Sequence, residues 1–470
     1  MKYVFITYNG LALPVAYKLQ QEGHEVIVGQ IQDVKDYVME DEIENAKETD
    51  FAKKRRLDLF KGMLDIRPAQ KVTDLLLKAD PKEYFVFFEE NNLYRWADKV
   101  RHLPFEGNFP TKEDFLFEID RDFAKKFVKE HYPRLYTPDV KEFSKIEEGI
   151  KFLRKTKEIW VLKGKDDSAP TFVPDVDVAD LANAQVIDML ENFPYKYQKL
   201  GFILEPFIPL ALELTPEIMF YDGVPLFSTI GIENKSFGSG NLSIQTGCAE
   251  DLVFPTYLED RINRIAFPPI VYEMAKTHKG LFIWDASLLV SKKDGKIFFG
   301  EFCSNRPGYN SFFTELSQVK TVNDFFMSSV EKVPALKPGT VGTSLRIFNM
   351  NRDEDTEQIS ENITVDFKPE IEKDLWLWDV KRDGSKKLLT VGADWNLAII
   401  TGAGKSINEA VNKMYKNVDG FSFVGSYYRS EDDFISQDYP TSILNRLNYG
   451  LERGLYRLPF EVRVGQIETR

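Results

Sequence analysis

A carboxylate, an amide and a guanidinium lie close together near the end of the segment 280–308. They belong to Glu301, Asn305 and Arg306, which follow an apolar run. The segment predicts two strands around Asp294-Gly295, because Asp-Gly between apolar runs is a strong hairpin signal. Carboxylate and amide oxygens suit a hard cation, and a guanidinium suits a phosphate or carboxylate group. A strand end with a solvated charge and a tight turn is the alternative interpretation.

The spacing of Glu301 and Asn305 decides whether one ion could bind both. In an extended strand the two side chains point the same way, about 13 Å apart at ~3.3 Å per residue. That distance is too long for a shared ion unless the chain bends. The sequence Arg306-Pro307-Gly308 predicts such a bend, because proline fixes φ and glycine permits a positive φ.

Length and composition limit the function classes. A chain of 470 residues predicts roughly three domains at ~150 residues each. The hydrophobic content of 43% and the charged content of 29% are typical of a globular protein without membrane spans. The net charge of −13 disfavours non-specific nucleic-acid binding. Two cysteines exclude a disulfide framework and a cysteine zinc site, and they indicate a reducing, cytoplasmic setting. We find neither a spanning segment nor a signal peptide.

The chain begins with a strand, helix and strand pattern. An apolar strand over 2–8, the turn Asn9-Gly10, a helix over 11–22 and a strand over 24–28 predict a parallel sheet with helices on its faces. The turn lacks the glycine fingerprint of dinucleotide-binding domains, which disfavours a dehydrogenase. The charged stretch 33–64 predicts a solvated or domain-capping helix.

Polar residues also follow other predicted strands. Glu90 follows the apolar strand 84–88, and ligands bind at the carboxyl ends of strands in open α/β sheets. Lys163 ends another apolar strand, where an ammonium could reach phosphates or could simply be solvated. The glycine-rich segment 231–247 predicts a functional loop.

The segment 398–429 carries a helix signal and a misleading glycine pattern. Ser406 predicts the N-cap of a helix over 407–418, with Glu409 at the third helical position as in a capping box. The sequence Gly402-AGKS is not a P-loop. That motif needs a glycine five residues before its Gly-Lys pair, and Ile399 occupies this position.

These pieces together resemble the ATP-grasp superfamily and, within it, the glycinamide ribonucleotide synthetase family. The segment 398–429 is similar to the family's closing segment, and the resemblance as a whole runs, with gaps, from Met1 to about Phe434. The resemblance implies an α/β fold with a parallel-sheet (pre-ATP-grasp) domain at 1–112 and an ATP-grasp α+β domain at 113–333. It implies a mobile lid at 135–205 and a small β-rich closing domain at 334–435. The tail 436–470 has no counterpart that we recognise.

The resemblance implies a nucleotide site. Lys163 and Arg121 take the places of phosphate-binding lysines, and Glu213 is the candidate for binding ribose. The residues that it places at ATP are Arg121, Lys163, Glu205, Phe207, Ile208, Glu213 and Lys235. Residues 165–170 depart from the family, because two carboxylates and a proline stand where a glycine-rich phosphate loop is expected.

The resemblance also implies a substrate site and a metal site. Its substrate residues are Gly10, Glu90, Asn241, Thr246, Gly247 and Arg306, and its metal ligands are Glu301, Asn305 and Asp285. The facing of Asp285 depends on the hairpin loop: a two-residue loop turns it away from Glu301, and a three-residue loop puts both on one face. Mg²⁺ or Mn²⁺ is the expected ion.

The implied activity is that of an ADP-forming carboxylate–amine ligase of purine biosynthesis, acting through an acylphosphate. Lys163 and Arg306 are its expected catalytic residues. A glycine-like carboxylate and an amine are its expected substrates, and the protein is expected to be a monomer or homodimer. Two alternatives stay open: a ligase with a different amine acceptor, and a non-catalytic relative that binds nucleotide.

Overall fold

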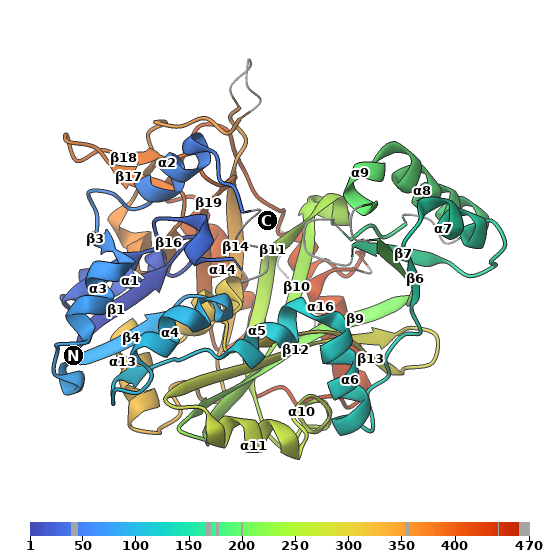
Figure 1. Cartoon of the computed structure of the whole chain (residues 1–470), viewed down its shortest axis with the longest axis horizontal. Coiled ribbons are helices and arrows are strands. Elements are labelled where there is room, and N and C mark those ends of the chain that lie inside the picture. Colours follow the sequence, from blue (N-terminus) through green and yellow to red (C-terminus); the bar gives the residue numbers. More distant parts are fainter. Residues whose placement is uncertain are drawn as a thin grey trace. The chain divides into compact units, whose positions relative to one another are not determined.

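The computed structural model describes residues 1–38, 46–164, 171–174, 178–198, 201–352, 358–439 and 441–459, except for the side chain of Ser243 (Figure 1). The chain forms two compact units. Unit 1 contains Met1–Phe115, Leu214–Ser287 and Phe302–Arg470, and unit 2 contains Leu116–Glu213 and Leu288–Glu301. The division into four segments expected from the sequence stays a prediction.

Unit 1 begins with a five-stranded parallel sheet, which confirms the predicted N-terminal α/β architecture. Its strands, in the order β3-β2-β1-β4-β5, are β3 (Asp65–Pro68), β2 (Val26–Gln30), β1 (Lys2–Thr7), β4 (Tyr84–Phe88) and β5 (Glu106–Gly107). Its helices are α1 (Leu13–Gln21), α2 (Asp50–Asp58), α3 (Ala69–Leu76), α4 (Tyr94–Val100) and α5 (Lys112–Ile119), of which α5 continues into unit 2. Every residue of β4 is buried, as expected for a strand covered on both faces.

A nine-stranded sheet follows, in the order β13-β12-β9-β10-β11-β14-β19-β16, with β21 paired to β14. Its strands are β9 (Leu210–Tyr221), β10 (Val224–Gly238), β11 (Leu242–Thr256), β12 (Leu281–Ser291), β13 (Ile297–Ser304), β14 (Val341–Asn349), β16 (Leu375–Leu377), β19 (Asn396–Gly404) and β21 (Ser426–Tyr427). Strands β9, β12 and β13 have residues in both units. The hairpin predicted for 280–308 is confirmed as β12 and β13.

The segment 231–247 is not the loop that the sequence predicted. It forms the end of β10 and the start of β11, which pair antiparallel from Ser228↔Thr256 to Gly238↔Leu242 with two register shifts. The glycines lie in these strands and in the short turn between them, where Gly240 and Asn241 have φ of 71° and 59°. Glycine content therefore marked a bulged hairpin rather than an open loop.

The remaining elements of unit 1 cover these sheets. They are α10 (Arg261–Ala266), α11 (Pro269–Thr277), α12 (Tyr309–Ser317), α13 (Val322–Val330), α14 (Ile407–Val418), α15 (Asp432–Ile435), α16 (Ile443–Glu452) and the short strands β15 (Asp366–Phe367), β17 (Val380–Arg382), β18 (Leu388–Thr390) and β20 (Phe421–Ser422). Short 3-10 turns lie at Val34–Asp36, Pro81–Glu83, Asn91–Leu93, Ser239–Asn241 and Pro369–Asp374. The predicted helix at 407–418 is confirmed, and Ser406 Oγ accepts from the backbone N–H of Glu409 at 3.3 Å.

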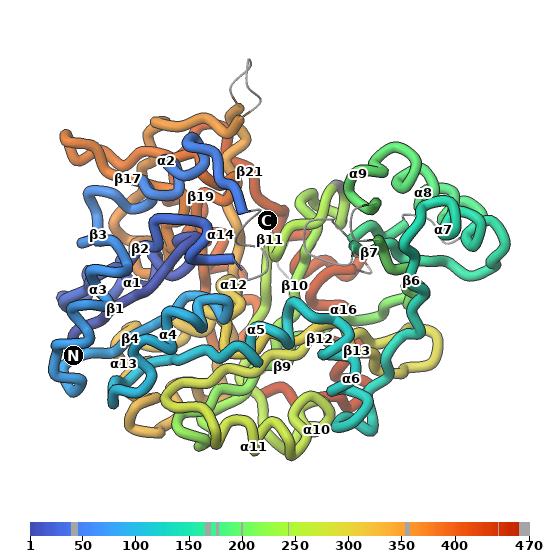
Figure 2. Tube along the Cα trace, in the orientation of Figure 1, coloured from blue at the N-terminus to red at the C-terminus, as the bar shows by residue number. Residues whose placement is uncertain are grey.

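Segments far apart in sequence meet within unit 1 (Figure 2). The charged helix α2 was expected to be solvated or domain-capping, and it has one exposed and one packed side: Arg55 and Arg56 are buried, and Arg55 donates to the carbonyl of Gly392 at 2.5 Å. The tail also packs on the sheet, because α16 contacts β10 and Arg446 donates to the carbonyl of Glu233 at 2.8 Å. The described part of the tail around α16 is therefore part of the scaffold of unit 1.

Unit 2 is built on a three-stranded antiparallel sheet in the order β6-β8-β7. Its strands and helices are β6 (Lys141–Phe143), β7 (Trp160–Gly164), β8 (Phe202–Pro206), α6 (Arg121–His131), α7 (Ile146–Leu153), α8 (Ala179–Asn192) and α9 (Pro194–Tyr197). Apolar residues of α7, α8 and the sheet form one core around Trp160 and Leu204. Helices α7 and α8 pack against each other.

None of the described helices is long and apolar enough to cross a membrane.

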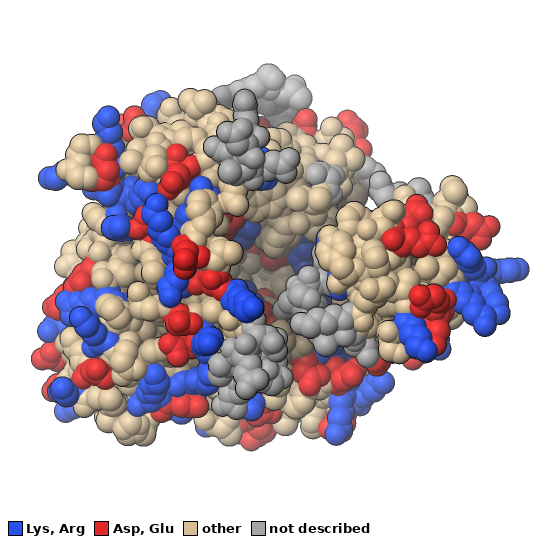
Figure 3. Space-filling model, turned by 45° about the horizontal axis from the view of Figure 1, so that its top comes forward, with Lys and Arg blue, Asp and Glu red and all other residues tan. Residues whose placement is uncertain are grey.

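On the face shown in Figure 3, basic and acidic side chains lie side by side. Neither sign of charge dominates that face, as the mixed composition predicts.

Candidate active site

The turn between β1 and α1 is filled by a carboxylate of the chain itself. Glu89 is fully buried and accepts from the backbone N–H groups of Tyr8 at 2.6 Å, Asn9 at 2.8 Å and Ala12 at 3.3 Å. Burial, together with the charge of Glu90, raises the pKa of Glu89 to about 7. The amides that would hold a phosphate in a dinucleotide fold are thus already used. This agrees with the missing glycine fingerprint.

The next residue, Glu90, is paired with a cation from a distant segment. Its carboxylate accepts from Asn9 Nδ2 at 3.0 Å and from the hydroxyl of Tyr37 at 2.9 Å, and it lies 3.2 Å from Nη2 of Arg306. Gly10 lies in the same turn with φ of 84°, and a Cβ there would be 2.8 Å from a methyl group of Leu59. The structure therefore brings together three predicted substrate residues, Gly10, Glu90 and Arg306.

The first turn of α12 connects this edge to the nine-stranded sheet. Tyr309 donates to the carbonyl of Glu89 at 2.7 Å, and Ser311 donates to Asp251 Oδ2 at 2.6 Å. Asn310 accepts from Nε of Arg346 at 2.8 Å. One helical turn thus contacts the residue after β4 and side chains of β11 and β14 in unit 1.

The predicted substrate residues of the β10–β11 hairpin separate into two groups. Thr246 donates to the carbonyl of Lys235 at 2.9 Å, and Gly247 lies beside the guanidinium of Arg346. Asn241 instead accepts from Nη2 of Arg429 at 2.9 Å, so its amide oxygen holds a buried arginine. Asn241 has a structural contact that the sequence did not reveal.

Three buried carboxyl groups, on β9, β11 and α12, lie near one another. Burial raises the pKa of Glu217 and of Asp251, and burial with the charges of Asp251 and Asp285 raises the pKa of Glu315 to about 8. Thr229 donates to Glu315 Oε1 at 2.8 Å. The candidate metal ligand Asp285 is therefore close enough to Glu315 for its charge to raise the pKa of that carboxyl group.

One group of side chains in this region has the geometry to hold a cation. One ligand atom from each of Glu233, Cys248 and Asp251 lies within 4.8 Å of the others. Burial, followed by the charges of Glu233 and Asp251, raises the pKa of the Cys248 thiol. The neutral thiol is a poor metal ligand, so we do not assign a metal to this group.

The predicted metal ligands in β13 and directly after it differ in exposure. Glu301 is exposed, whereas Asn305 is fully buried and neither polar atom of its side chain has a hydrogen-bond partner among the described residues. The bend falls on Asn305 itself, which has φ of 51°. The hairpin closes with the N–H of Ser291 donating to the carbonyl of Lys296, so residues 292–295 form a loop longer than either length considered.

Three cations of unit 2 gather where β7 and β8 meet α6. Lys163 and Lys125 lie 2.5 and 2.6 Å from the two oxygens of Glu205, and Arg121 donates to the carbonyl of Gly164 at 3.2 Å. Burial would raise the pKa of Glu205, but the two lysine charges outweigh it and hold the pKa at about 2. Lys125 was not predicted, because the resemblance pointed to Arg121, one turn earlier in α6.

The other predicted nucleotide residues lie after β8. Phe207 donates its backbone N–H to the carbonyl of Ile159 at 2.8 Å, so the sheet already uses that donor. Ile208 and Glu213 are partly buried, the latter in β9. Lys235 lies in unit 1, 3.9 Å from Glu233. The unusual phosphate loop 165–170 lies outside the described residues.

The low pKa of Glu205 predicts acid sensitivity in unit 2. A depressed pKa stabilises the fold above the unfolded value of about 4.5, and this stability is lost as the pH falls toward 2. Glu205→Gln should remove up to about 3 kcal/mol of pH-dependent stability. Urea unfolding at pH 6, 4 and 3 measures this, with the exposed ion-pair residue Glu191→Gln as the control. Equal pH slopes in wild type and Glu205→Gln would contradict the prediction.

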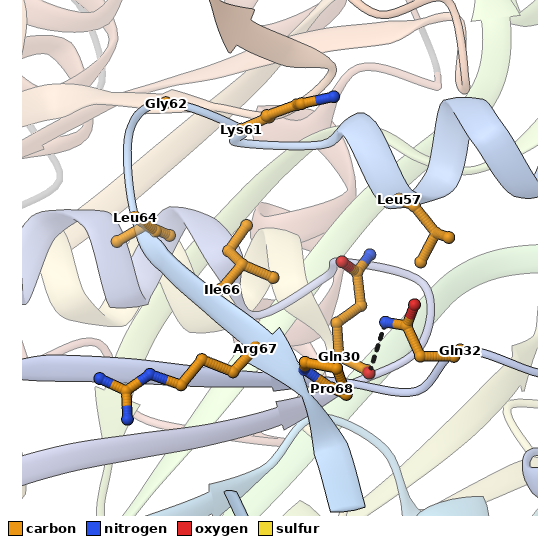
Figure 4. Close-up of a pocket in the computed structure, with 9 residues that line it drawn as sticks. All are labelled: Gln30, Gln32, Leu57, Lys61, Gly62, Leu64, Ile66, Arg67 and Pro68. Atoms are coloured by element: carbon orange, nitrogen blue, oxygen red, sulfur yellow. Dashed lines mark hydrogen bonds between the residues drawn. The ribbon is translucent and has the colours of Figure 1, made fainter. Parts of the chain in front are cut away.

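A pocket of about 370 Å³ lies elsewhere in unit 1, beside the ends of β2 and β3 (Figure 4). Gln30, Gln32, Lys61 and Arg67 are among its lining residues. Gln30 donates to the carbonyl of Arg56, Gln32 donates to the carbonyl of Gln30, and Arg67 pairs with Asp65. Since none of the predicted site residues lines this pocket, we assign it no role.

No family model matches the chain, and no curated protein sequence matches it. Solved structures do match. Phosphoribosylamine–glycine ligase of Thermotoga maritima has a TM-score of 0.63 and 15% identity, over 92% of this chain and all of that one. The biotin carboxylase domain of 2-oxoglutarate carboxylase of Hydrogenobacter thermophilus, solved with MgADP and bicarbonate, has a TM-score of 0.56 and 13% identity, over 97% and 99%. N5-carboxyaminoimidazole ribonucleotide synthetase of Thermotoga maritima has a TM-score of 0.51 and 14% identity, over 90% and 99%.

Proposed function

We propose that this chain, which has the ATP-grasp fold, is an ATP-dependent ligase that joins a carboxylate to an amine and releases ADP. The observation that carries the proposal is a group of three cations in unit 2: Lys163 and Lys125 pair with the single carboxylate of Glu205, and Arg121 donates to the nearby carbonyl of Gly164. Three positive charges against one negative charge leave a net attraction for a polyphosphate. Lys163 and Arg121 would thus bind the phosphates of ATP together with Lys125.

The proposed reaction proceeds in two steps. An oxygen of the substrate carboxylate attacks the γ-phosphorus of ATP, ADP leaves, and an acylphosphate forms. The amine then attacks the acyl carbon, and the carbon–oxygen bond to phosphate breaks and releases inorganic phosphate. Both steps need charge stabilisation rather than a covalent enzyme intermediate. Lys163 would stabilise the transferring phosphoryl group, and Arg306 would stabilise the acylphosphate.

The proposed metal ligands fit a hard divalent cation. Glu301 offers an exposed carboxylate, and Asn305 offers a buried amide oxygen without a hydrogen-bond donor among the described residues. Oxygen donors of this kind suit Mg²⁺ or Mn²⁺. When bound, the ion would neutralise phosphate charge. Asp285 is the third proposed ligand, from the strand that precedes Glu301.

The proposed substrates are small molecules. Glycine and phosphoribosylamine, the two compounds in the name of the Thermotoga maritima ligase, are the first pair to test. The edge formed by Gly10, Glu90 and Arg306 would bind the amine-bearing substrate, since Glu90 offers a carboxylate to an ammonium or a hydroxyl group. A different amine acceptor is the alternative within the same chemistry. We place the enzyme in the cytoplasm, as a monomer or homodimer acting in purine biosynthesis.

Coupled detection of ADP tests the proposal. We expect ADP release from Mg-ATP and glycine only when freshly generated phosphoribosylamine is present. Lys163→Met should reduce release about 100-fold or more, because it removes a charge from the phosphoryl group. Lys157→Met, an exposed lysine of unit 2, is the matched control and should act as wild type. If this pair gives no ADP, a screen of amino acids and amines follows, and no release from any pair would overturn the proposal.

A further inference from the structure

Arg346 is the exception in an otherwise buried strand. Every other residue of β14 is buried, and β14 lies between β11 and β19 in the interior of the nine-stranded sheet. A partly exposed arginine in such a strand must have its charge compensated by water, by a protein acid or by a ligand. Its surroundings distinguish these cases.

The chain orients the Arg346 guanidinium through one edge only. Nε donates to Asn310 Oδ1 at 2.8 Å, and Asn310 Nδ2 donates to Ser344 Oγ at 3.3 Å. The guanidinium carbon lies 6.0 Å from the centre of the Trp378 ring, at the outer limit of a cation–π contact. Among the described residues, no acceptor bonds to either Nη atom and no carboxylate pairs with the guanidinium. The two Nη atoms are thus held in place but not used.

Gly247 faces both Nη atoms of Arg346. A Cβ added to Gly247 would lie 3.9 Å from Nη2 and 4.0 Å from Nη1, and apart from Gly247 and its two chain neighbours no other described residue has an atom within 4 Å of it. Glycine at this position therefore places no side chain against the two donors. A planar carboxylate or a phosphate can accept from two parallel N–H groups in this geometry.

Charges on the neighbouring strands set the local field. Glu233 and Asp251 raise the pKa of the adjacent Cys248 thiol, after the larger effect of burial, whereas Arg346 and Lys235 lower it. The acids are engaged elsewhere, because Asp251 accepts from Ser311 and Glu233 lies near Lys235. Arg346 thus supplies positive charge next to Gly247.

We propose that Arg346 and Gly247 form a binding site for an oxyanion, either a carboxylate or a phosphate, of a substrate. The assignment of this anion to a substrate rests on the proposed ligase function, but the binding of the anion does not. Arg346 would supply the two donors, Asn310 would fix their direction, and Gly247 would leave the space. Thr246 and Gly247, predicted from the sequence as substrate residues, would then act by framing this arginine.

Isothermal titration without nucleotide tests the site, using acetate, glycine, inorganic phosphate and ribose 5-phosphate as probes. We expect at least one probe to bind, and Arg346→Gln should weaken that binding about 10- to 100-fold, the effect of a lost hydrogen bond to a charged group. Arg264→Gln, an exposed arginine of α10, is the control. Binding of acetate and glycine would identify a carboxylate site, and binding of the two phosphates a phosphate site.

Substitutions at Gly247 test the same anion site even if the Arg346→Gln variant does not fold. Gly247→Asp places a carboxylate of the chain itself in front of Arg346, so it should abolish binding of the probes. Gly247→Ala adds only a methyl group, at ordinary contact distance from the guanidinium, and it should keep binding within about threefold of wild type. Equal affinities in Gly247→Asp and Gly247→Ala, or no binding of any probe to wild type, would overturn the proposal. ADP release by the wild type is measured separately, so a failed ligase assay does not decide the anion site.

Discussion

Replacing Arg429 with methionine is expected to lower the free energy of unfolding by about 3–5 kcal/mol, the effect of removing one partner from a buried ion pair. Arg429 is 1% exposed, and its Nε lies 3.0 Å from Glu250 and its Nη2 lies 3.2 Å from Asp433. It also donates to the carbonyls of Ser236 and Gly238, at 2.6 and 2.7 Å. The arginine thus joins the segment before α15 to the β10–β11 hairpin.

The loss should be large because the acids stay behind. Burial raises the pKa of Glu250 to about 7 even though the Arg429 charge lowers it, so the variant would leave a buried acid with less compensation. Urea unfolding measures the effect. Arg67→Met is the control, because Arg67 pairs with Asp65 at an exposed site and should cost about 1 kcal/mol or less. A loss in Arg429→Met no larger than in Arg67→Met would show that the network does not stabilise the fold.

Replacing Glu301 with glutamine is expected to reduce ADP formation about 100- to 1000-fold, on the scale of removing one electrostatic group from an active site. Glutamine keeps the size of the side chain but removes the negative charge that would hold the proposed cation. Stability should change by about 0.5 kcal/mol or less, because Glu301 is exposed. A loss of turnover without unfolding would separate a functional role from a structural one.

The control for Glu301→Gln comes from the same hairpin. Asp294 lies in the loop between β12 and β13, is solvent-exposed and pairs with Lys296 at 3.3 Å. Asp294→Asn removes the same charge from the same hairpin and should keep wild-type turnover. If Glu301→Gln turned over as fast as Asp294→Asn, Glu301 would not be a metal ligand.

Local signals in the sequence predicted much of the fold. The strand 84–88 and the helix 407–418 have the predicted bounds, because an unbroken apolar run and a serine N-cap are encoded by neighbouring residues. The hairpin around Asp294-Gly295 is also confirmed, and the resemblance indicated the correct fold class. These features depend on short-range patterns, which a single sequence displays directly.

The contacts that build the candidate site were harder to predict, because they join residues far apart in the chain. Glu90 meets Arg306, Lys125 meets Glu205, and Arg429 meets Glu250. The resemblance proposed Glu90 and Arg306 separately, without their pairing. Arg346 gave no signal, since an arginine in an apolar strand resembles any solvated charge. The β10–β11 hairpin was predicted as a loop because its glycines are numerous, although Gly231, Gly238 and Gly247 lie in the strands and only Gly240 lies in the turn between them.

The transfer of oxygen from carboxylate to phosphate tests the ligase proposal most directly. The substrate is glycine labelled with ¹⁸O in both carboxylate oxygens, or the carboxylate found by the ADP screen, with Mg-ATP and its amine partner. An acylphosphate route predicts that each inorganic phosphate released contains one ¹⁸O atom, because the carbon–oxygen bond breaks in the second step. ADP release with unlabelled phosphate would contradict the account, since water would then have attacked ATP and the carboxylate would not have been activated.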